Sequence, residues 1–378
     1  MPGECGEAVM TCRIRDAVRF VAVIAVAGIG SISAAVAADW QDGAGPEWQK
    51  TLAAARAEGT VVVTGRPEIA DKFMEAFKRD TGITMEFLGG VGRDLDSRLE
   101  REMNSGHLTI DVMLTGANGV DYVAKGQLDP IKPRLMLPGV TDPKNWNDGR
   151  LKWVDKGEAY MFTPNEYLFG WPLFNTAGVK LESIVTWQDL LKPEFKGKIA
   201  SFDPRPGGPG QAAAAYLTDR FGIEWVKKLY VGQDVKLARD SRQLAEWVAR
   251  GVYPIGIGTL AVEIERFKKG GIKTLEVKSM ADGPGSILGG SSVAIMPKGA
   301  PHPNAATVFL NWYASNPAQT IFATVWQTPS RRLDVKVDNI PDYVVPQHGV
   351  KYLDQYSENW YVQTRPKLVE EIVKVLGR

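Results

Sequence analysis

The chain has 378 residues, of which 44% are hydrophobic and 24% are charged, and its formal net charge is +1. This length allows two domains with sizeable cores, and the composition is ordinary for a soluble globular protein. The near-neutral charge, without a basic block or a zinc-ligand spacing, argues against nucleic acid as a partner.

The first 38 residues are typical of a signal peptide. Three arginines precede an apolar run over residues 20–30, and this run is too short to span a membrane. A small-x-small cleavage motif follows, so we expect the mature chain to begin near Ala38 or Asp39 and the protein to be periplasmic. An uncleaved anchor helix is the alternative.

Both cysteines, Cys5 and Cys12, precede the apolar run. Cleavage would therefore leave a mature chain without cysteine. This predicts no disulfide, no thiol nucleophile and no cysteine metal site. A lipid anchor is not expected either, because no cysteine follows the run.

Strand and helix patterns alternate after this leader. After a helix over 46–58, strands are expected at 60–64, 83–88 and 110–115, and helices at 68–80, 94–105 and 120–126. Apolar residues recur every four positions along these helices, and short glycine-rich links separate the elements. Such alternation predicts a parallel, doubly wound sheet that binds ligands at the carboxyl ends of its strands.

A second alternation follows a proline-rich run of loops. Residues 167–175 are apolar without a helical face. Beyond them, strands are expected at 199–202, 236–238, 252–258 and 291–296, and helices at 211–221, 223–231, 241–250, 261–269, 304–315, 317–326 and 367–376. Because the alternation occurs twice, we expect two lobes of like construction.

One stretch carries a family resemblance. Residues 186–204, TWQDLLKPEFKGKIASFDP, combine a short amphipathic piece, a lysine-flanked turn and a strand. The stretch resembles the second-lobe entry of extracellular solute-binding proteins of ABC importers, in the branch with ferric-iron, phosphonate and sugar-phosphate binders. Further similar segments, at 60–115, 241–272 and 291–335, follow in the same order. The resemblance implies an α/β, type II periplasmic-binding-protein-like fold, in which crossover strands join two doubly wound lobes around a cleft.

The resemblance also implies domain boundaries and partners. The first lobe would comprise residues 39–168 and 291–335, and the second residues 169–290 and 336–378. Such a protein captures a small solute in its cleft and delivers it to the permease and ATPase of an ABC importer. We expect a monomer that has no cofactor, no catalytic residues and no membrane anchor after cleavage.

Candidate ligand-binding residues lie at or near the expected strand ends. The loop at 203–210 places glycines and Arg205 before a helix, which suits an anion, although a plain loop stiffened by prolines is the alternative. Arginine matches carboxylate or phosphate with its planar fork, and Arg66 and Arg205 are the first choices. Arg93 and Arg332 are additional candidates. The predicted set is Thr64, Gly65, Arg66, Thr115, Gly116, Asn165, Tyr167, Arg205, Gly207, Gly208, Arg239, Thr259 and Arg331.

These residues favour an organic or phosphorylated anion as the solute. Ferric members of the family carry adjacent tyrosines after the strand similar to 252–258, where this sequence has Thr259-Leu260-Ala261. No metal site is therefore predicted, and ferric iron or an iron complex is an alternative ligand. A sugar is another, with four tryptophans as stacking surfaces: Trp153, Trp171, Trp326 and Trp360. A periplasmic hydrolase or transferase is the alternative of another class, although the sequence has no GxSxG or HExxH motif.

Overall fold

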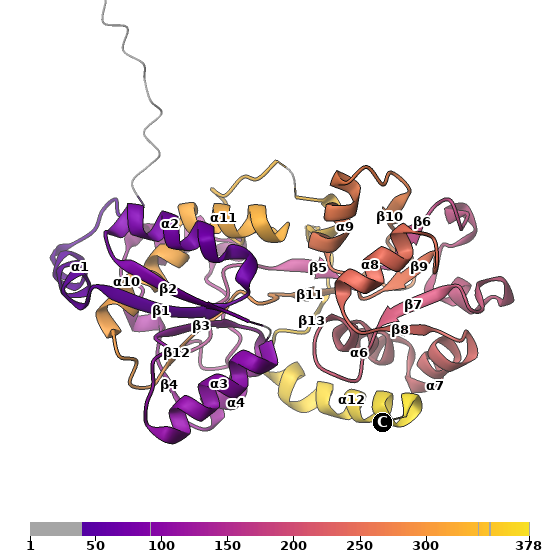
Figure 1. Cartoon of the computed structure of the whole chain (residues 1–378), viewed down its shortest axis with the longest axis horizontal. Coiled ribbons are helices and arrows are strands. Elements are labelled where there is room, and N and C mark those ends of the chain that lie inside the picture. Colours follow the sequence, from indigo (N-terminus) through magenta and orange to yellow (C-terminus); the bar gives the residue numbers. More distant parts are fainter. Residues whose placement is uncertain (1–39, 91, 339, 348, 378) are drawn as a thin grey trace, which may run out of the picture. The chain divides into compact units, whose positions relative to one another are not determined.

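The computed structural model describes residues 40–90, 92–338, 340–347 and 349–377 (Figure 1). The expected signal peptide and both cysteines lie outside the described residues. Residues 40–378 form one compact unit by their contacts. No described helix is long and apolar enough to cross a membrane.

The first lobe is built on a five-stranded sheet with the order β2-β1-β3-β12-β4. Its strands are β1 (Thr60–Gly65), β2 (Thr84–Gly89), β3 (Val112–Thr115), β4 (Leu128–Asp129) and β12 (Val293–Pro297). β1 is parallel to β2 and β3, as expected. β12 is antiparallel to β3, a direction on which the sequence made no prediction. It runs the opposite way because it enters from the edge where the parallel strands end.

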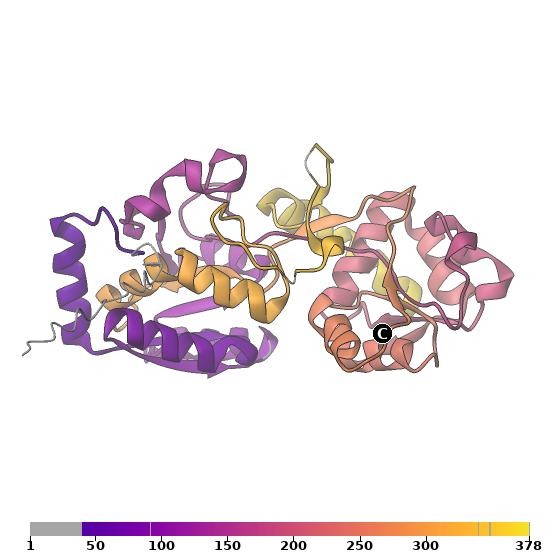
Figure 2. The ribbon, with the colours of Figure 1, turned by 90° about the horizontal axis from the view of Figure 1, so that it is seen from above.

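Six helices pack around this sheet (Figures 1 and 2). They are α1 (Pro46–Glu58), α2 (Ala70–Thr81), α3 (Gly92–Ser105), α4 (Val120–Ala124), α10 (Pro303–Tyr313) and α11 (Asn316–Trp326). The four-residue spacing of Phe73 and Phe77 in α2 places both rings against Trp312 of α10, with centroids 5.1 and 5.3 Å apart. Residues 305–313 of α10 are all buried, so this apolar helix forms the centre of the first core.

The second lobe has a sheet with the order β10-β6-β9-β7-β8. Its strands are β6 (Leu173–Asn175), β7 (Ile199–Phe202), β8 (Lys236–Ala238), β9 (Ile255–Ile257) and β10 (Leu275–Val277). β7 lies parallel to β8 and β9, while β6 is antiparallel to its neighbours. Its helices are α6 (Pro209–Phe221), α7 (Ile223–Lys227), α8 (Ser241–Ala249), α9 (Ala261–Lys269) and α12 (Arg365–Leu376). α12 packs on α6 and α7.

A third sheet of three short strands connects the two lobes, in the order β13-β11-β5. These strands are β5 (Tyr167–Phe169), β11 (Ser286–Leu288) and β13 (Leu353–Asp354). The sequence predicted one apolar run over 167–175, but Gly170 adopts a left-handed φ of 111° and divides it into β5 and β6. Between β4 and β5 lie only α5 (Pro138–Thr141) and single 3₁₀ turns, in agreement with the expected loops.

Candidate functional site

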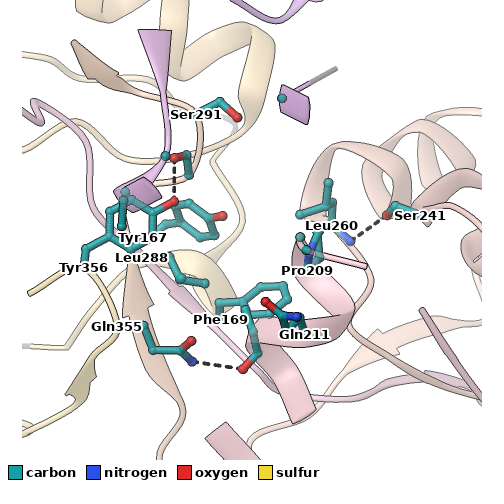
Figure 3. A pocket seen from close by; sticks show the side chains of 18 of the residues that line it. Tyr167, Phe169, Pro209, Gln211, Ser241, Leu260, Leu288, Ser291, Gln355 and Tyr356 are labelled. Carbon is teal, nitrogen blue, oxygen red and sulfur yellow. Dashed lines mark hydrogen bonds between the residues drawn. The ribbon is translucent and has the colours of Figure 1, made fainter. Parts of the chain in front are cut away.

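A cavity of about 1080 Å³ lies where the parallel strands of both lobes end. The first lobe contributes Arg66, which follows β1, and Thr115 to Asn118 at the end of β3. The second lobe contributes residues that follow β7, β8 and β9. Figure 3 shows Tyr167 and Tyr356, from the connecting sheet and the segment after it, on one side, and Leu260 and Ser241 on the other. The position agrees with the rule that doubly wound sheets bind ligands at the carboxyl ends of their strands.

Three helices of the second lobe begin at this cavity: α6, α8 and α9. α6 starts directly above the end of β7, where a Cβ on Gly210 would lie 2.3 Å from the Phe202 carbonyl oxygen. Asp240 caps α8 by accepting a hydrogen bond from the Gln243 backbone at 2.8 Å. The backbone N–H groups and the dipole at a helix N-terminus favour negative charge. The second lobe therefore presents three helix N-termini to one cavity, and that of α8 already carries the Asp240 carboxylate as its cap.

Four arginines line the cavity, and they differ in their partners. The guanidinium of Arg66 contacts Glu68 at 3.2 Å and lies over the Trp326 ring at 5.4 Å. Arg365 lies over the Tyr361 ring at 4.4 Å and donates to Gln211. The exposed side chains of Arg93 and Arg239 have no partner in the described part of the chain. These two are therefore available to a ligand without breaking an existing contact.

Aromatic side chains cover much of the remaining lining. They are Tyr167, Phe169, Trp171, Phe202, Phe322, Trp326, Tyr343, Tyr356, Trp360 and Tyr361. The Tyr356 hydroxyl donates to the Gly290 carbonyl at 2.6 Å, and the Tyr343 hydroxyl donates to Glu265 at 2.9 Å. Burial raises the pKa of the Tyr167, Tyr343, Tyr356 and Tyr361 phenols above its ordinary value. All four phenols therefore remain protonated and neutral at physiological pH.

Asp96 of α3 places a carboxyl group at the same cavity. Its Oδ2 accepts a hydrogen bond from the Asn118 amide at 2.9 Å, while Oδ1 has no partner in the described structure. Burial raises the pKa of Asp96 to about 6, and the nearby Glu100 and Asp121 carboxylates add to the effect. The described residues contain no group of three or more His, Cys, Asp or Glu side chains that could hold a metal ion.

The structure brings eight of the thirteen predicted site residues to the cavity. They are Arg66, Thr115, Gly116, Tyr167, Gly207, Gly208, Arg239 and Thr259. Arg93, an additional candidate, also lines it. The lining residues that the prediction omitted include Gln211, Gln355, Tyr356, Tyr361 and Arg365. Four of these five residues follow β11 in the chain. The sequence analysis expected residues 336–378 to return to the second lobe, and that expectation could have pointed to them.

The two other predicted arginines do not line the cavity, and the guanidinium of each binds at least one carboxylate group. Arg205 donates to Asp203 through Nε and Nη2, at 2.9 and 2.6 Å, and these hydrogen bonds lower the pKa of Asp203. Arg331 is 3% exposed and forms ion pairs with Glu166 at 3.2 Å and Asp148 at 3.3 Å. Both guanidinium groups therefore hold loops together.

The remaining predicted residues are also absent from the lining. Thr64 and Asn165 are fully buried. Gly65 packs between Phe87 and Leu114, which would lie 3.1 and 3.3 Å from a Cβ there. Arg332, another candidate, is ion-paired to Asp334 at 2.7 Å and lies over the Trp146 ring.

Comparison with known proteins identifies the family. Residues 72–343 match the family model described as bacterial extracellular solute-binding protein. The chain belongs to this family. A Salmonella typhi relative named for 2-aminoethylphosphonate binding in the periplasm is 22% identical over 291 residues, which are 76% of this chain and 80% of the relative.

Solved structures of other solute-binding proteins share the fold. The substrate-binding protein of an ABC transporter from Agrobacterium tumefaciens has a TM-score of 0.67 and 19% identity, over 84% of this chain and 94% of that chain. The apo ferric ion-binding protein A of Pasteurella haemolytica has a TM-score of 0.65 and 17% identity, over 84% of this chain and 98% of that chain. The expected fold, two α/β lobes joined by crossover strands around a cleft, is confirmed. As a family member, the protein serves an ABC importer as its solute-binding component.

Proposed function

We propose that this solute-binding protein captures a small organic or phosphorylated anion in the cavity between its lobes. One observation carries the proposal: α6, α8 and α9 all begin at the cavity, next to the guanidinium of Arg239, which has no partner among the described residues. The Thr259 hydroxyl supports it, because this side chain is 9% exposed, lines the cavity and has no hydrogen-bond partner in the described structure. Buried polar groups are normally paired, so a ligand atom is the expected partner.

The test uses 2-aminoethylphosphonate, the compound for which the Salmonella typhi relative is named. Calorimetry should show at least ~10-fold weaker binding for Arg239→Ala, because a charge-assisted contact contributes more than the ~1.4 kcal/mol that corresponds to that factor. Arg239→Lys should restore only part of the affinity, since lysine lacks the planar fork.

A matched control is available at the other end of α8. The Arg250 side chain is 72% exposed and pairs with Glu246 within the helix. Arg250→Ala should leave the Kd within twofold. An Arg239→Ala protein that binds as well as the wild type would refute the anion proposal.

A sugar or sugar phosphate is the second candidate. Three of the four tryptophans that the sequence suggested as stacking surfaces, Trp171, Trp326 and Trp360, line the cavity, and Trp153 does not. A neutral sugar should bind equally well to the wild type and to Arg239→Ala. Ferric iron is less favoured, because no adjacent tyrosines follow β9, where the sequence has Thr259-Leu260-Ala261, and a hard ferric ion prefers anionic oxygen ligands.

We further propose that the protein is exported by its leader, works as a monomer and acts with the permease and the ATPase of an ABC importer. The mass of periplasmic protein should correspond to a chain that begins near Ala38 or Asp39. A solute recovered unchanged after incubation would support binding without catalysis, and a modified solute would support the hydrolase or transferase alternative.

A further inference from the structure

Three first-lobe side chains line the cavity near the end of α11. Trp326 is the last residue of α11, Thr328 follows two positions later, and Arg66 follows β1. All three line the cavity. The Arg66 guanidinium lies over the Trp326 ring at 5.4 Å, and Trp326 in turn stacks on Phe322 at 6.3 Å.

Each of these side chains has a buried polar atom without a hydrogen-bond partner in the described structure. The atoms are Arg66 Nε, Trp326 Nε1 and Thr328 Oγ1. Thr328 is only 7% exposed. The guanidinium and indole N–H groups can only donate, and the hydroxyl can donate as well. All three atoms can therefore donate a hydrogen bond to an acceptor on a ligand.

The contacts around these side chains hold them without supplying that acceptor. Glu68 binds Arg66 only through Nη2, which leaves Nε free. Between Trp326 and Thr328, Gln327 adopts left-handed backbone angles of 54° and 42°, and its side chain donates to the Thr324 carbonyl at 2.6 Å. Left-handed backbone is unfavourable for a residue with a Cβ, so packing must maintain the turn that brings Thr328 to the cavity.

We propose that Arg66, Trp326 and Thr328 form an oxyanion subsite, in which a carboxylate or phosphonate group of the solute accepts hydrogen bonds from these three side chains. The inference rests on the proposed anion-binding function and adds a first-lobe contact to the second-lobe contact at Arg239. A ligand held from both lobes binds the closed arrangement more tightly than the open one, which is the condition for ligand-driven closure. The Arg66 head group, 29% exposed, is the part that can turn towards the incoming group.

The experiment measures binding of two oxyanion probes and one blank to the full mature protein. The probes are 2-aminoethylphosphonate and β-alanine, which carries a carboxylate in place of the phosphonate, and the blank is ethylamine. The variants are Thr328→Val and Trp326→Phe, each of which removes a hydrogen-bonding group and keeps most of the apolar surface. We expect each variant to have a Kd at least about fivefold higher than the wild type for one or both oxyanion probes. The probe whose Kd rises shows whether the subsite binds a phosphonate or a carboxylate.

Two controls remove similar unpartnered groups away from the cavity. Thr60 Oγ1 and Trp187 Nε1 are buried and have no partner among the described residues, and neither residue lines the cavity. Thr60→Val and Trp187→Phe should leave the affinity for both probes unchanged. A structural role for Thr328 would lower the melting temperature of the ligand-free protein, whereas a ligand-binding role predicts an unchanged or higher value, because an unsatisfied group has been removed.

The outcomes separate this inference from the proposed function. If Arg239→Ala loses affinity while Thr328→Val and Trp326→Phe bind both probes like the wild type, the first-lobe subsite is refuted and the proposed function stands. An equal loss of ethylamine binding would also refute the subsite, because ethylamine has no oxyanion. If the wild type binds neither oxyanion probe, both proposals are overturned.

Discussion

Arg205 and Arg239 both follow a second-lobe strand, but only Arg239 is free to meet a ligand. Arg205 has Asp203 two residues before it and binds both carboxylate oxygens. Arg239 has Asp240 beside it, but that carboxylate accepts from the Gln243 backbone as the cap of α8. Arg332 and Arg66 also have acidic partners two residues away. Asp334 binds Arg332, and Glu68 binds one end of the Arg66 guanidinium. The local position of an acidic residue thus decides which cavity-side arginine is available.

Gly210 should be intolerant of any side chain. A Cβ there would lie 2.3 Å from the Phe202 carbonyl oxygen and 2.6 Å from that of Asp203, and both atoms are backbone. Gly210→Ala should therefore lower the free energy of unfolding by about 1–3 kcal/mol or more, as overpacking does. Gly207→Ala is the control, because a Cβ at Gly207 would meet no atom within 4 Å. Urea denaturation compares the two, and equal stability would contradict the close approach of α6 to β7.

Asp96 should make stability depend on pH in the acidic range. Its pKa in the folded protein is about 6, above the ordinary value of 3.8, because burial disfavours the carboxylate. Between these two values the folded state binds more protons than the unfolded state, so stability falls as the pH rises. Asp96→Asn should therefore be more stable than the wild type at pH 7.5, and the difference should shrink towards pH 4. A pH-independent difference in urea midpoints would refute this account.

At the scale of elements, an ion network joins two of the three strands that connect the lobes. Lys152 pairs with Glu166, which directly precedes β5, and with Asp354 of β13 at 3.0 Å. Glu166 also contacts the buried Arg331 at 3.2 Å. The side chains of Lys152 and Glu166 are only 10% and 15% exposed. This network fixes the connecting strands to the first lobe.

Lys152→Met should destabilise the fold more than the loss of an exposed pair would. Removing one partner of a buried ion pair leaves the other charge without compensation. Because the remaining Asp354 side chain is partly exposed, we expect the free energy of unfolding to fall by roughly 3 kcal/mol. Lys196→Met removes an ion pair with Asp234 whose side chains are 60% and 62% exposed, and it should cost about 0–1 kcal/mol. Chemical denaturation checks both values. Similar losses in the two variants would argue against a structural role for the network.

The sequence predicted most elements, and its misses have physical causes. The boundaries of α1, β7, β8 and α9 agree with the prediction to the residue. β10 and β11 were not predicted; both have three residues, a length at which a period of two gives little signal, although β8 of the same length was recognised. Of the site, periodicity located the strand ends and hence the region of the cavity. It could not show that Arg205 is bound to Asp203, because that depends on side-chain direction rather than on spacing.

At the scale of the whole molecule, the cavity draws its lining from both lobes and from the strands that connect them. Arg66 belongs to the first lobe and Arg239 to the second, so a solute that contacts both bridges the two lobes. We therefore expect the protein to become more compact when it binds. Small-angle scattering should show a smaller radius of gyration with 2-aminoethylphosphonate or another solute that calorimetry has shown to bind.

The same binding should raise thermal stability by mass action. The expected gain is RT ln(1 + [L]/Kd), about 2.7 kcal/mol when the free solute is at one hundred times its Kd. Arg239→Ala tests the link between closure and contact, because it removes a second-lobe contact and leaves the first-lobe residues intact. When both proteins are saturated with solute, the variant should show a smaller fraction of compact molecules than the wild type. The reason is that, without Arg239, the solute's affinities for the open and the closed states differ less. If a confirmed solute stabilises the wild type without any compaction, the protein binds in a preformed cavity and the two-lobe grip is wrong.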